Sequence, residues 1–496
     1  MDNFKKILVK TRNLPFILDK PLSDLLTLLG FTAVKVQEDN IVGELYLTAE
    51  PSDKAFSICC ADFIDLTGIK LSAECKLETR AERGEWTRSA KIAMLSVLIQ
   101  AFDIANPPWG ILTGVRPGKL ANKILFSGED PEKVLVEKYL LAGSNAKLIS
   151  DIAKKQNSIL SKSFKDIAVY IGVPYCPSRC LYCSFPAGVM PAEDEFQQNF
   201  CNSVEEDIRA VVQLVSMYGL HIKSLYIGGG TPTSLNDIFF RKLMKCVSTN
   251  FSVDLIGEFT VEAGRPDCLT ADKLLAMEEA GVNRISINPQ TMHDRTLVTI
   301  GRQHNVKQVY EAFTAIRKSN IPVVNMDLIV GLPQEGINDI EYSLDKMLDF
   351  YPENLTVHTL ALKKNSPLFH MWKDYEFISA EEASLVFDHA ALAAEKLGMG
   401  PYYLYRQHYM LGNLANIGYA KPGTECIYNM QMMEEQYTVI GIGPSSATKV
   451  PASDGHHLYK FHMPKNFYDY KTNAQQLFAK RAETIALRYE QEEENC

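Results

Sequence analysis

The chain has 496 residues, too many for one hydrophobic core, and its 46% hydrophobic and 22% charged residues are typical of a globular protein of two or three domains. Acidic residues number 60 and basic residues 51, so the formal net charge is −9. This acidity argues against a general nucleic-acid binder, because phosphate contacts need a basic surface, but it leaves room for a local basic pocket.

The N-terminus reads MDNFKKILVK, which is polar and has no apolar signal segment. The longest apolar stretch, Ile92–Ala105, contains Gln100 and Asp103 and is too short to span a bilayer, so no membrane insertion is expected. We therefore expect a cytoplasmic protein. In that compartment the eleven cysteines are thiols or metal ligands rather than a disulfide framework.

Residues 1–160 predict an N-terminal α+β domain, to which the sequence assigns no role. Strands are expected over Ile41–Thr48 and Ala55–Ile64, and helices over Ser89–Asp103 and Pro131–Leu141. A polar stretch follows, after which the spacing of the apolar residues changes, and this change marks the end of the domain.

Residues 165–375 alternate short apolar runs with helical segments. The expected strands are Ile167–Val173, Ser224–Ile227, Glu258–Glu262, Arg284–Asn288, Val323–Val330 and Asn354–Leu360, and the expected helices are Asp194–Tyr218, Ile238–Thr249, Ala271–Ala280, Arg295–Lys318 and Ile337–Phe350. Six β/α units in succession predict an α/β fold, a partial (β/α)6 barrel related to the TIM barrel, with chemistry at the carboxyl ends of its strands. Residues 376–496 are irregular and aromatic, and they are expected to form a C-terminal accessory domain that covers the substrate.

The first strand of this barrel runs into the sequence PYCPSRCLYCSFP. Its three cysteines, Cys176, Cys180 and Cys183, have C-x3-C-x2-C spacing on one loop. Thiolates are the usual ligands of iron–sulfur clusters, and three ligands leave one iron of a [4Fe–4S] cubane open. A zinc site would need a second cysteine pair or histidines, and this loop has neither. The motif therefore favours a cluster over zinc or packing cysteines.

The cysteine loop, with the aromatic Tyr182 before its last cysteine, resembles the motif of the radical S-adenosylmethionine (SAM) superfamily. Its flanks, IGVPYCPSRCLYCSFP, are similar to the oxygen-independent coproporphyrinogen III oxidase group, and within it to the HemZ-type coproporphyrinogen dehydrogenases. The likeness extends from residue 165 to about residue 450, and WGILTGVRPGKL in the first domain also resembles this subgroup. It implies a [4Fe–4S] cluster and SAM as cofactors.

The resemblance also implies a set of SAM-binding residues at successive strand ends. The run Gly228, Gly229, Gly230, Thr231 and Pro232 looks like the GGGTP motif whose backbone binds the SAM amino group; alone it could be only a tight turn. Glu262, Gln290, Arg302 and Asp327 match the polar residues around SAM. Arg302 has the fork geometry suited to a carboxylate, and Asp327 suits ribose hydroxyls.

The activity implied by the resemblance is oxygen-independent oxidative decarboxylation of coproporphyrinogen III to protoporphyrinogen IX. A SAM-derived 5′-deoxyadenosyl radical takes a hydrogen atom from a propionate, which becomes a vinyl group, and a low-potential donor such as flavodoxin or ferredoxin supplies electrons. The substrate is a porphyrinogen with four carboxylates, so cations are expected in the pocket. Tyr170 and Arg406 are the substrate-side candidates that the resemblance gives, and Lys363 and Lys364 are further candidates that follow the sixth strand.

Two other functions remain open at this stage. The better-known oxidases carry a further cysteine at the position of Phe185, and the related heme chaperones lack it too. Those chaperones carry an H-N-x-x-Y-W heme-binding signature, whereas residues 428–433 here read YNMQMM, which favours the enzyme. A binding module with a vestigial cluster site is the third possibility, and the retained SAM set argues against it. The scattered histidines His293, His304, His358 and His408 are each expected to be structural.

Overall fold

The computed structural model describes residues 4–36, 40–51, 56–78, 80–114, 116–160, 163–406, 410, 414–453 and 457–493. The chain divides into two compact units, Met1–Lys154 and Lys155–Cys496. In the described part of the chain, every helix is too short or too polar to cross a membrane.

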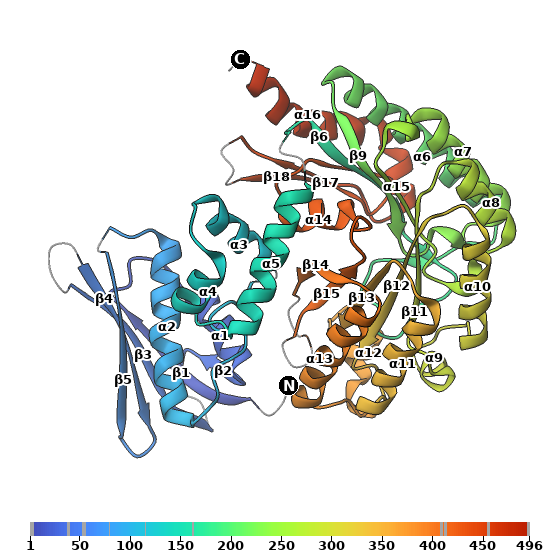
Figure 1. Cartoon of the computed structure of the whole chain (residues 1–496). Helices are drawn as coiled ribbons and strands as arrows, with labels where there is room; N and C mark the ends of the chain where they lie inside the picture. The colour runs from blue at the N-terminus through green and yellow to red at the C-terminus, as the bar shows by residue number, and fades with distance from the viewer. Residues whose placement is uncertain are drawn as a thin grey trace. The chain divides into compact units, whose positions relative to one another are not determined.

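The first unit is an α+β fold built on a five-stranded sheet. The strand order is β2 (Phe31–Val34), β1 (Lys5–Arg12), β3 (Ile41–Pro51), β4 (Phe56–Asp65), β5 (Lys70–Glu78), and the helices are α1 (Asp19–Leu28), α2 (Arg83–Phe102), α3 (Pro117–Phe126), α4 (Pro131–Tyr139) and α5 (Gly143–Ile159), the last of which crosses into the second unit. Alternate residues of β3, such as Leu45 and Leu47, pack with Trp86 and Met94 of α2 in one core. Helix α2 lies along β4 and β5 (Figure 1). The two strands and two helices predicted here are confirmed, except that Ala55 lies outside the described residues.

The second unit contains the predicted barrel. Its parallel strands, in sheet order, are β6 (Asp166–Val173), β9 (His221–Gly229), β10 (Glu258–Glu262), β11 (Arg284–Gln290), β12 (Val323–Val330) and β13 (Asn354–Thr359), and its helices are α6 (Asp194–Met217), α7 (Asp237–Asn250), α8 (Ala271–Glu279), α9 (Asp294–Thr299), α10 (Val306–Lys318) and α11 (Ile337–Phe350). The helices ring the outside of the strands (Figure 1). The six strands of the sequence analysis are confirmed, so the strand ends that carry the candidate site residues share one edge.

One predicted helix is in fact two. The segment expected to be helical from Arg295 to Lys318 breaks between Thr299 and Val306. Gly301 adopts φ +74°, which ends α9, and a capping box between Asn305 and Gln308 starts α10. The break matters because it carries Arg302 on an irregular segment rather than on a helix face.

The C-terminal segment, expected to be a separate domain over residues 376–496, instead extends the same sheet. Strands β14 (Gly400–Tyr405) and β15 (Asn416–Ala420) add to β13, and β16 (Val439–Ile442), β17 (Ala447–Pro451) and β18 (Leu458–His462) add to β6, so that the described residues form one sheet of eleven strands. The helices of this segment are α13 (Ala380–Lys396), α14 (Ile427–Glu434), α15 (Phe467–Thr472) and α16 (Ala474–Glu493), and α12 (Pro367–Met371) lies just before it. Aromatic side chains such as Tyr402 and Tyr428 share one apolar cluster with Ala168 of β6. Their burial in the barrel's own core explains why this segment is not a separate unit.

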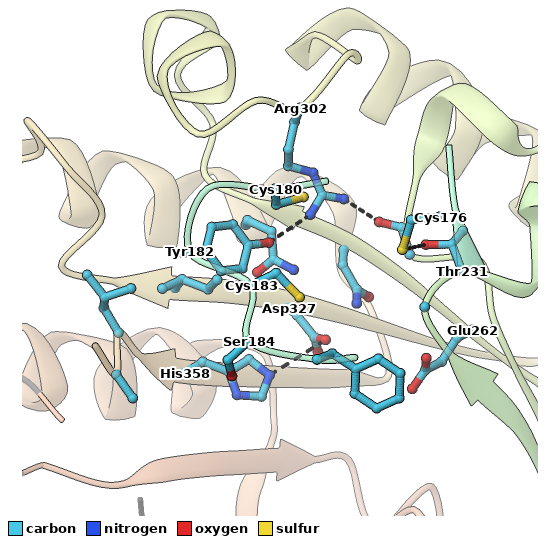
Figure 2. A pocket seen from close by; sticks show the side chains of 18 of the residues that line it. Cys176, Cys180, Tyr182, Cys183, Ser184, Thr231, Glu262, Arg302, Asp327 and His358 are labelled. Atoms are coloured by element: carbon cyan, nitrogen blue, oxygen red, sulfur yellow. Dashed lines mark hydrogen bonds and ion pairs between the residues drawn. The ribbon is translucent and has the colours of Figure 1, made fainter. Parts of the chain in front are cut away.

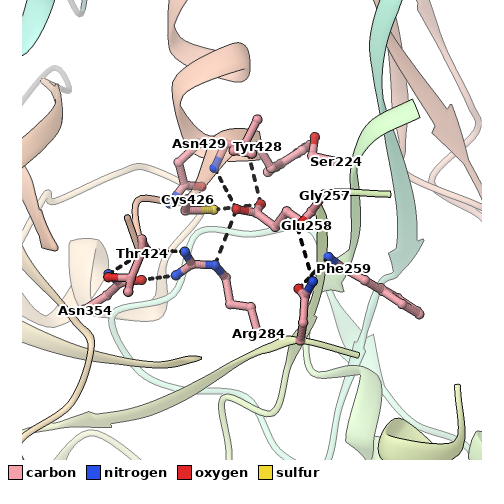
Figure 3. Close-up of polar contacts among 12 residues, drawn as sticks. Ser224, Gly257, Glu258, Phe259, Arg284, Asn354, Thr424, Cys426, Tyr428 and Asn429 are labelled. Carbon is pink, nitrogen blue, oxygen red and sulfur yellow. Dashed lines mark hydrogen bonds and ion pairs between the residues drawn. The ribbon is translucent and has the colours of Figure 1, made fainter. Parts of the chain in front are cut away.

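A buried polar network closes the amino end of the barrel (Figure 3). Glu258, the first residue of β10, accepts hydrogen bonds from the backbone N–H groups of Ile427 (2.6 Å) and Tyr428 (3.1 Å), so it caps α14. Arg284, the first residue of β11, lies 3.4 Å from the same carboxylate and also donates to Asn354. The ion pair of Arg284 with Glu258 and the hydrogen bond of Arg284 to Asn354 join the starts of three barrel strands, so this end of the barrel is structural and the chemistry lies at the other end.

Candidate active site

A cavity of about 540 Å³ opens at the carboxyl ends of the barrel strands (Figure 2). It is lined by most of the residues singled out from the sequence: Cys176, Cys180, Tyr182, Cys183, Gly229, Gly230, Thr231, Glu262, Gln290, Arg302 and Asp327. These residues, with Gly264, Arg265 and Asn288, are called the cysteine wall. A loop, four successive strands and the break before α10 supply them, so the fold gathers residues that span more than 150 positions of the chain.

The cysteine loop is held in place by contacts outside the cavity. Leu181 N–H donates to the Ile300 carbonyl (2.9 Å), and the Leu181 carbonyl accepts from Leu368 N–H (2.9 Å). Arg179 donates to the Asn365 carbonyl (2.9 Å). Leu181 also packs into an apolar cluster with Ile300 and Leu368. These contacts fix the loop so that its three thiols face one cavity.

The thiols form an all-sulfur donor set. The Cys176 sulfur lies 3.7 Å from the Thr231 hydroxyl, and burial raises the pKa of the Cys176 thiol to about 11. Among the described residues, no three His, Cys, Asp or Glu side chains converge on a point where one metal ion would sit. Three thiols that face one cavity from a single short loop are the donor set that an iron–sulfur cluster uses.

Gly229, Gly230 and Thr231 pack directly against the start of the cysteine loop, between Val173 and Cys176. Gly229 adopts φ +122°, a conformation that other residues rarely reach, and a Cβ on Gly230 would lie 2.9 Å from the Cys176 sulfur. Gly230 N–H and Thr231 N–H donate to the carbonyls of Val173 and Tyr175. Gly228 is not among the lining residues. Glycines are needed here because side chains would push the two loops apart.

Glu262 presents a carboxylate to the cavity at the end of β10. It accepts a hydrogen bond from the Tyr226 hydroxyl (2.6 Å) and one from Gly229 N–H (3.2 Å). Burial outweighs these hydrogen bonds and raises the pKa of Glu262 to about 7. The group therefore changes charge near neutral pH.

Arg302 and Gln290 each carry a buried polar atom with no hydrogen-bond partner among the described residues, namely Arg302 Nε and Gln290 Oε1. Arg302 is oriented by the Tyr182 hydroxyl (3.2 Å) and the Gly264 carbonyl, and Gln290 adopts φ +71° at an irregularity in the β11–β12 register. Such buried polar atoms are costly unless a ligand satisfies them. The cavity therefore fits a polar molecule with both donors and acceptors.

The two substrate-side residues that the resemblance gives, Tyr170 and Arg406, do not line the cavity. The Tyr170 ring stacks 5.8 Å from that of Tyr428 and 6.2 Å from that of Tyr226, inside the barrel. Arg406 is buried, which lowers its pKa to about 10. It is the preceding residue, Tyr405, that lines the cavity, since neighbouring side chains of an extended chain point to opposite faces. The structure does not support direct substrate contact by Tyr170 or Arg406.

Other residues line the cavity that were not assigned to it from the sequence. His358 Nε2 lies 3.6 Å from Asp327 Oδ2, and its Nδ1 lies 3.2 Å from the Tyr405 hydroxyl, so this histidine has two side-chain partners and also lines the cavity. His408 lies outside the described residues. The remaining lining residues from β13 to β15, called the edge wall, are Thr359, Leu360, Ala361, Lys363, Tyr405 and Asn416. Lys363 was already a substrate-side candidate from the sequence, and the one sequence signal in this set is that Leu360, Ala361 and Lys363 follow the sixth strand.

Comparisons with known proteins agree with this geometry. The sequence model of the radical SAM superfamily matches residues 170–347. The chain is 36% identical over 379 residues to the oxygen-independent coproporphyrinogen-III oxidase-like protein HemZ of Bacillus subtilis, covering 74% of this chain and 75% of that protein. It is 30% identical to the heme chaperone HemW of the same organism, covering 56% of this chain and 69% of that protein. The structure of coproporphyrinogen III oxidase HemN from Escherichia coli shares the fold, with a TM-score of 0.51 at 20% identity over 66% of this chain and 73% of that chain.

Proposed function

The chain belongs to the radical SAM superfamily, in the group related to oxygen-independent coproporphyrinogen III oxidases, and from that premise we propose that it oxidatively decarboxylates coproporphyrinogen III to protoporphyrinogen IX. The superfamily uses a [4Fe–4S] cluster and SAM, and it acts on small molecules with the help of a reductant. The observation that carries the proposal is the cysteine wall, where three thiols and the orphaned Arg302 and Gln290 atoms share one cavity.

The residues of the cysteine wall divide between the two cofactors. Cys176, Cys180 and Cys183 would ligate the cluster, which leaves one iron for SAM. Bound together, the cluster and SAM supply a carbon-centred radical that can take a hydrogen atom from an unactivated carbon. For SAM itself, Arg302 would hold the carboxylate and Asp327 the ribose hydroxyls, and the remaining contacts would come from Tyr182, Gly229, Gly230, Thr231, Glu262 and Gln290.

The edge wall has the character that a porphyrinogen requires. Leu360 and Ala361 offer apolar surface to the tetrapyrrole ring. Lys363 is half-buried, no hydrogen bond or ion pair holds its ammonium among the described residues, and burial lowers its pKa. A half-buried cation without a counter-ion is best stabilised by an anionic ligand. We therefore assign a substrate carboxylate to Lys363 in place of Arg406.

The reaction removes the elements of formic acid from each of two propionates. A hydrogen atom leaves the carbon β to the carboxylate, and the bond to the carboxylate carbon then breaks. Carbon dioxide leaves, one electron passes to a one-electron acceptor such as the oxidised form of an electron-transfer protein, and a vinyl group remains. The chain's own part is to orient the propionate and exclude water. A low-potential donor such as flavodoxin or ferredoxin would supply the electron that starts each cycle.

Heme delivery is the second candidate, because HemW chaperones are among the relatives. The segment at the position of their heme signature, Tyr428 to Met433, lies in α14 here. Within it Met430 is 0% exposed, Gln431 accepts a hydrogen bond from Ser224 (2.6 Å), and the Tyr428 ring lies 4.4 Å from that of Tyr226. A helix packed in this way offers little surface to heme, which supports the enzyme.

The test is anaerobic incubation of the reconstituted protein with SAM, a low-potential reductant and coproporphyrinogen III, with product analysis, beside a titration with heme. Protoporphyrinogen IX formed together with 5′-deoxyadenosine supports the dehydrogenase. Stoichiometric heme binding with no vinyl product would instead support the chaperone.

A further inference from the structure

A buried arginine that the SAM set does not include lies against the cysteine loop. Arg265 follows β10, is 2% exposed and lines the cavity. Its Nη1 lies 3.7 Å from the Cys180 sulfur, to which it donates, and its Nη2 donates to the Ser178 hydroxyl at 3.1 Å. The guanidinium therefore contacts the loop both at a proposed cluster ligand, Cys180, and at Ser178, two residues before it.

Arg265 is fixed by a carboxylate and a histidine behind it. Asp267 accepts hydrogen bonds from Arg265 at 3.2 and 3.3 Å, and His304 Nδ1 lies 3.5 Å from the same carboxylate. Burial opposes the ionisation of Asp267, but hydrogen bonds from His304 and Arg265 outweigh it and lower the carboxyl pKa. Desolvation lowers the pKa of His304, which is 3% exposed. The site therefore holds the positive charge of Arg265 beside the negative charge of Asp267.

This charge pair has a consequence for electron transfer that rests on the proposed cluster ligands. Reducing a cluster adds negative charge, part of which resides on the ligand sulfurs. A donor to a ligand sulfur stabilises the reduced form, whereas a nearby carboxylate destabilises it. We infer that Arg265 is a positioning residue that raises the reduction potential of the cluster through the Cys180 sulfur, and that Asp267 limits that rise.

Arg265 and Asp267 must then shift the reduction potential of the cluster in opposite directions, and the experiment measures these two shifts. Midpoint potentials of the reconstituted cluster are determined by EPR-monitored redox titration without SAM, together with the iron content. R265M is expected to move the midpoint potential to a more negative value. R265K keeps the positive charge but lacks the forked guanidinium, so it is expected to move the midpoint potential less. D267N is expected to move it to a more positive value. R295M, which removes an exposed arginine paired with Asp339, serves as the control and should not move it.

Each outcome has a distinct meaning. Shifts of opposite sign with full iron content support the inference. Unchanged potentials, or shifts of the same sign in R265M and D267N, overturn it and leave the proposed function intact. Loss of iron from both R265K and R265M would show that Arg265 only holds the loop, which also overturns it. A wild-type protein that binds no cluster would overturn the ligand assignment itself.

Discussion

The two walls of the cavity are built in different ways. The cysteine wall is made of short motifs, each recognisable within a few residues, which neighbouring parallel strands bring together, as Gly230 of one motif packs against Cys176 of another. The edge wall comes from separate strands, with Leu360 after β13, Tyr405 at the end of β14 and Asn416 at the start of β15. Short sequence motifs therefore reveal the cofactor side, whereas the substrate side shows no such motif and depends on how distant strands pair.

The largest effect expected on the cysteine wall is that of C180A. Removing one of three thiolates should abolish the iron–sulfur absorbance and SAM cleavage, because a cubane held at two corners is not retained. C201A is the matched control, since Cys201 is a buried thiol on α6 whose sulfur donates to the Phe239 carbonyl. A cluster that survives in C180A with full iron content would refute the ligand assignment.

The second-largest effect expected on the cysteine wall is a loss of SAM affinity without loss of the cluster. R302A and D327A should each weaken SAM binding about tenfold to a hundredfold, the result of losing roughly 1.5–3 kcal/mol from a hydrogen bond to a charged group. Iron content should stay unchanged, because neither residue is a cluster ligand. Calorimetry measures the affinity, and wild-type affinity in both variants would mean that these strand ends do not hold SAM.

The edge wall is tested by two neighbouring lysines. K363M should weaken binding of coproporphyrin III, the air-stable oxidised form of the substrate, by about tenfold, since it removes a half-buried cation from the cavity. K364M should have little effect, because Lys364 is exposed and is not a lining residue. Fluorescence titration gives both affinities. Equal losses in the two variants would indicate general electrostatic attraction rather than a binding site.

The smallest effect concerns the pH dependence of stability. Burial raises the pKa of Glu262 from its ordinary 4.5 to about 7, so the folded chain holds this proton more tightly than the unfolded chain. The resulting stability is present in full below about pH 4.5 and is lost as the pH rises through 7. E262Q cannot ionise and should gain melting temperature relative to the wild type between pH 5.5 and pH 8.5, without SAM. A difference independent of pH would contradict the raised pKa.

The sequence predicted the barrel strands because each is a short apolar run bounded by turns, and the cysteine wall because its residues follow those runs. It missed Arg265 and His358 because a lone arginine or histidine after a strand carries no signal of its partners, which here are Cys180, Asp327 and Tyr405. It also merged α9 and α10, since both have helical periodicity and the break depends on Gly301.

The substrate side was harder to predict because it depends on which face of a strand a residue occupies. Arg406 and Tyr405 are adjacent, and only the strand register decides that the tyrosine faces the cavity. The C-terminal segment was expected to be a separate domain since its apolar residues are irregularly spaced. That spacing reflects short strands whose partners lie far away in the sequence: β15 pairs antiparallel with β13, and β16 pairs parallel with β6.

The most direct test traces a hydrogen atom from the substrate, placed at the edge wall, into 5′-deoxyadenosine, which forms at the cysteine wall. Coproporphyrinogen III deuterated on the carbon β to each propionate carboxylate is incubated anaerobically with the reconstituted protein, SAM and reductant. The account predicts that mass spectrometry finds deuterium in 5′-deoxyadenosine, in step with the appearance of vinyl groups. SAM cleavage that yields only unlabelled 5′-deoxyadenosine, with all propionates intact, would contradict it.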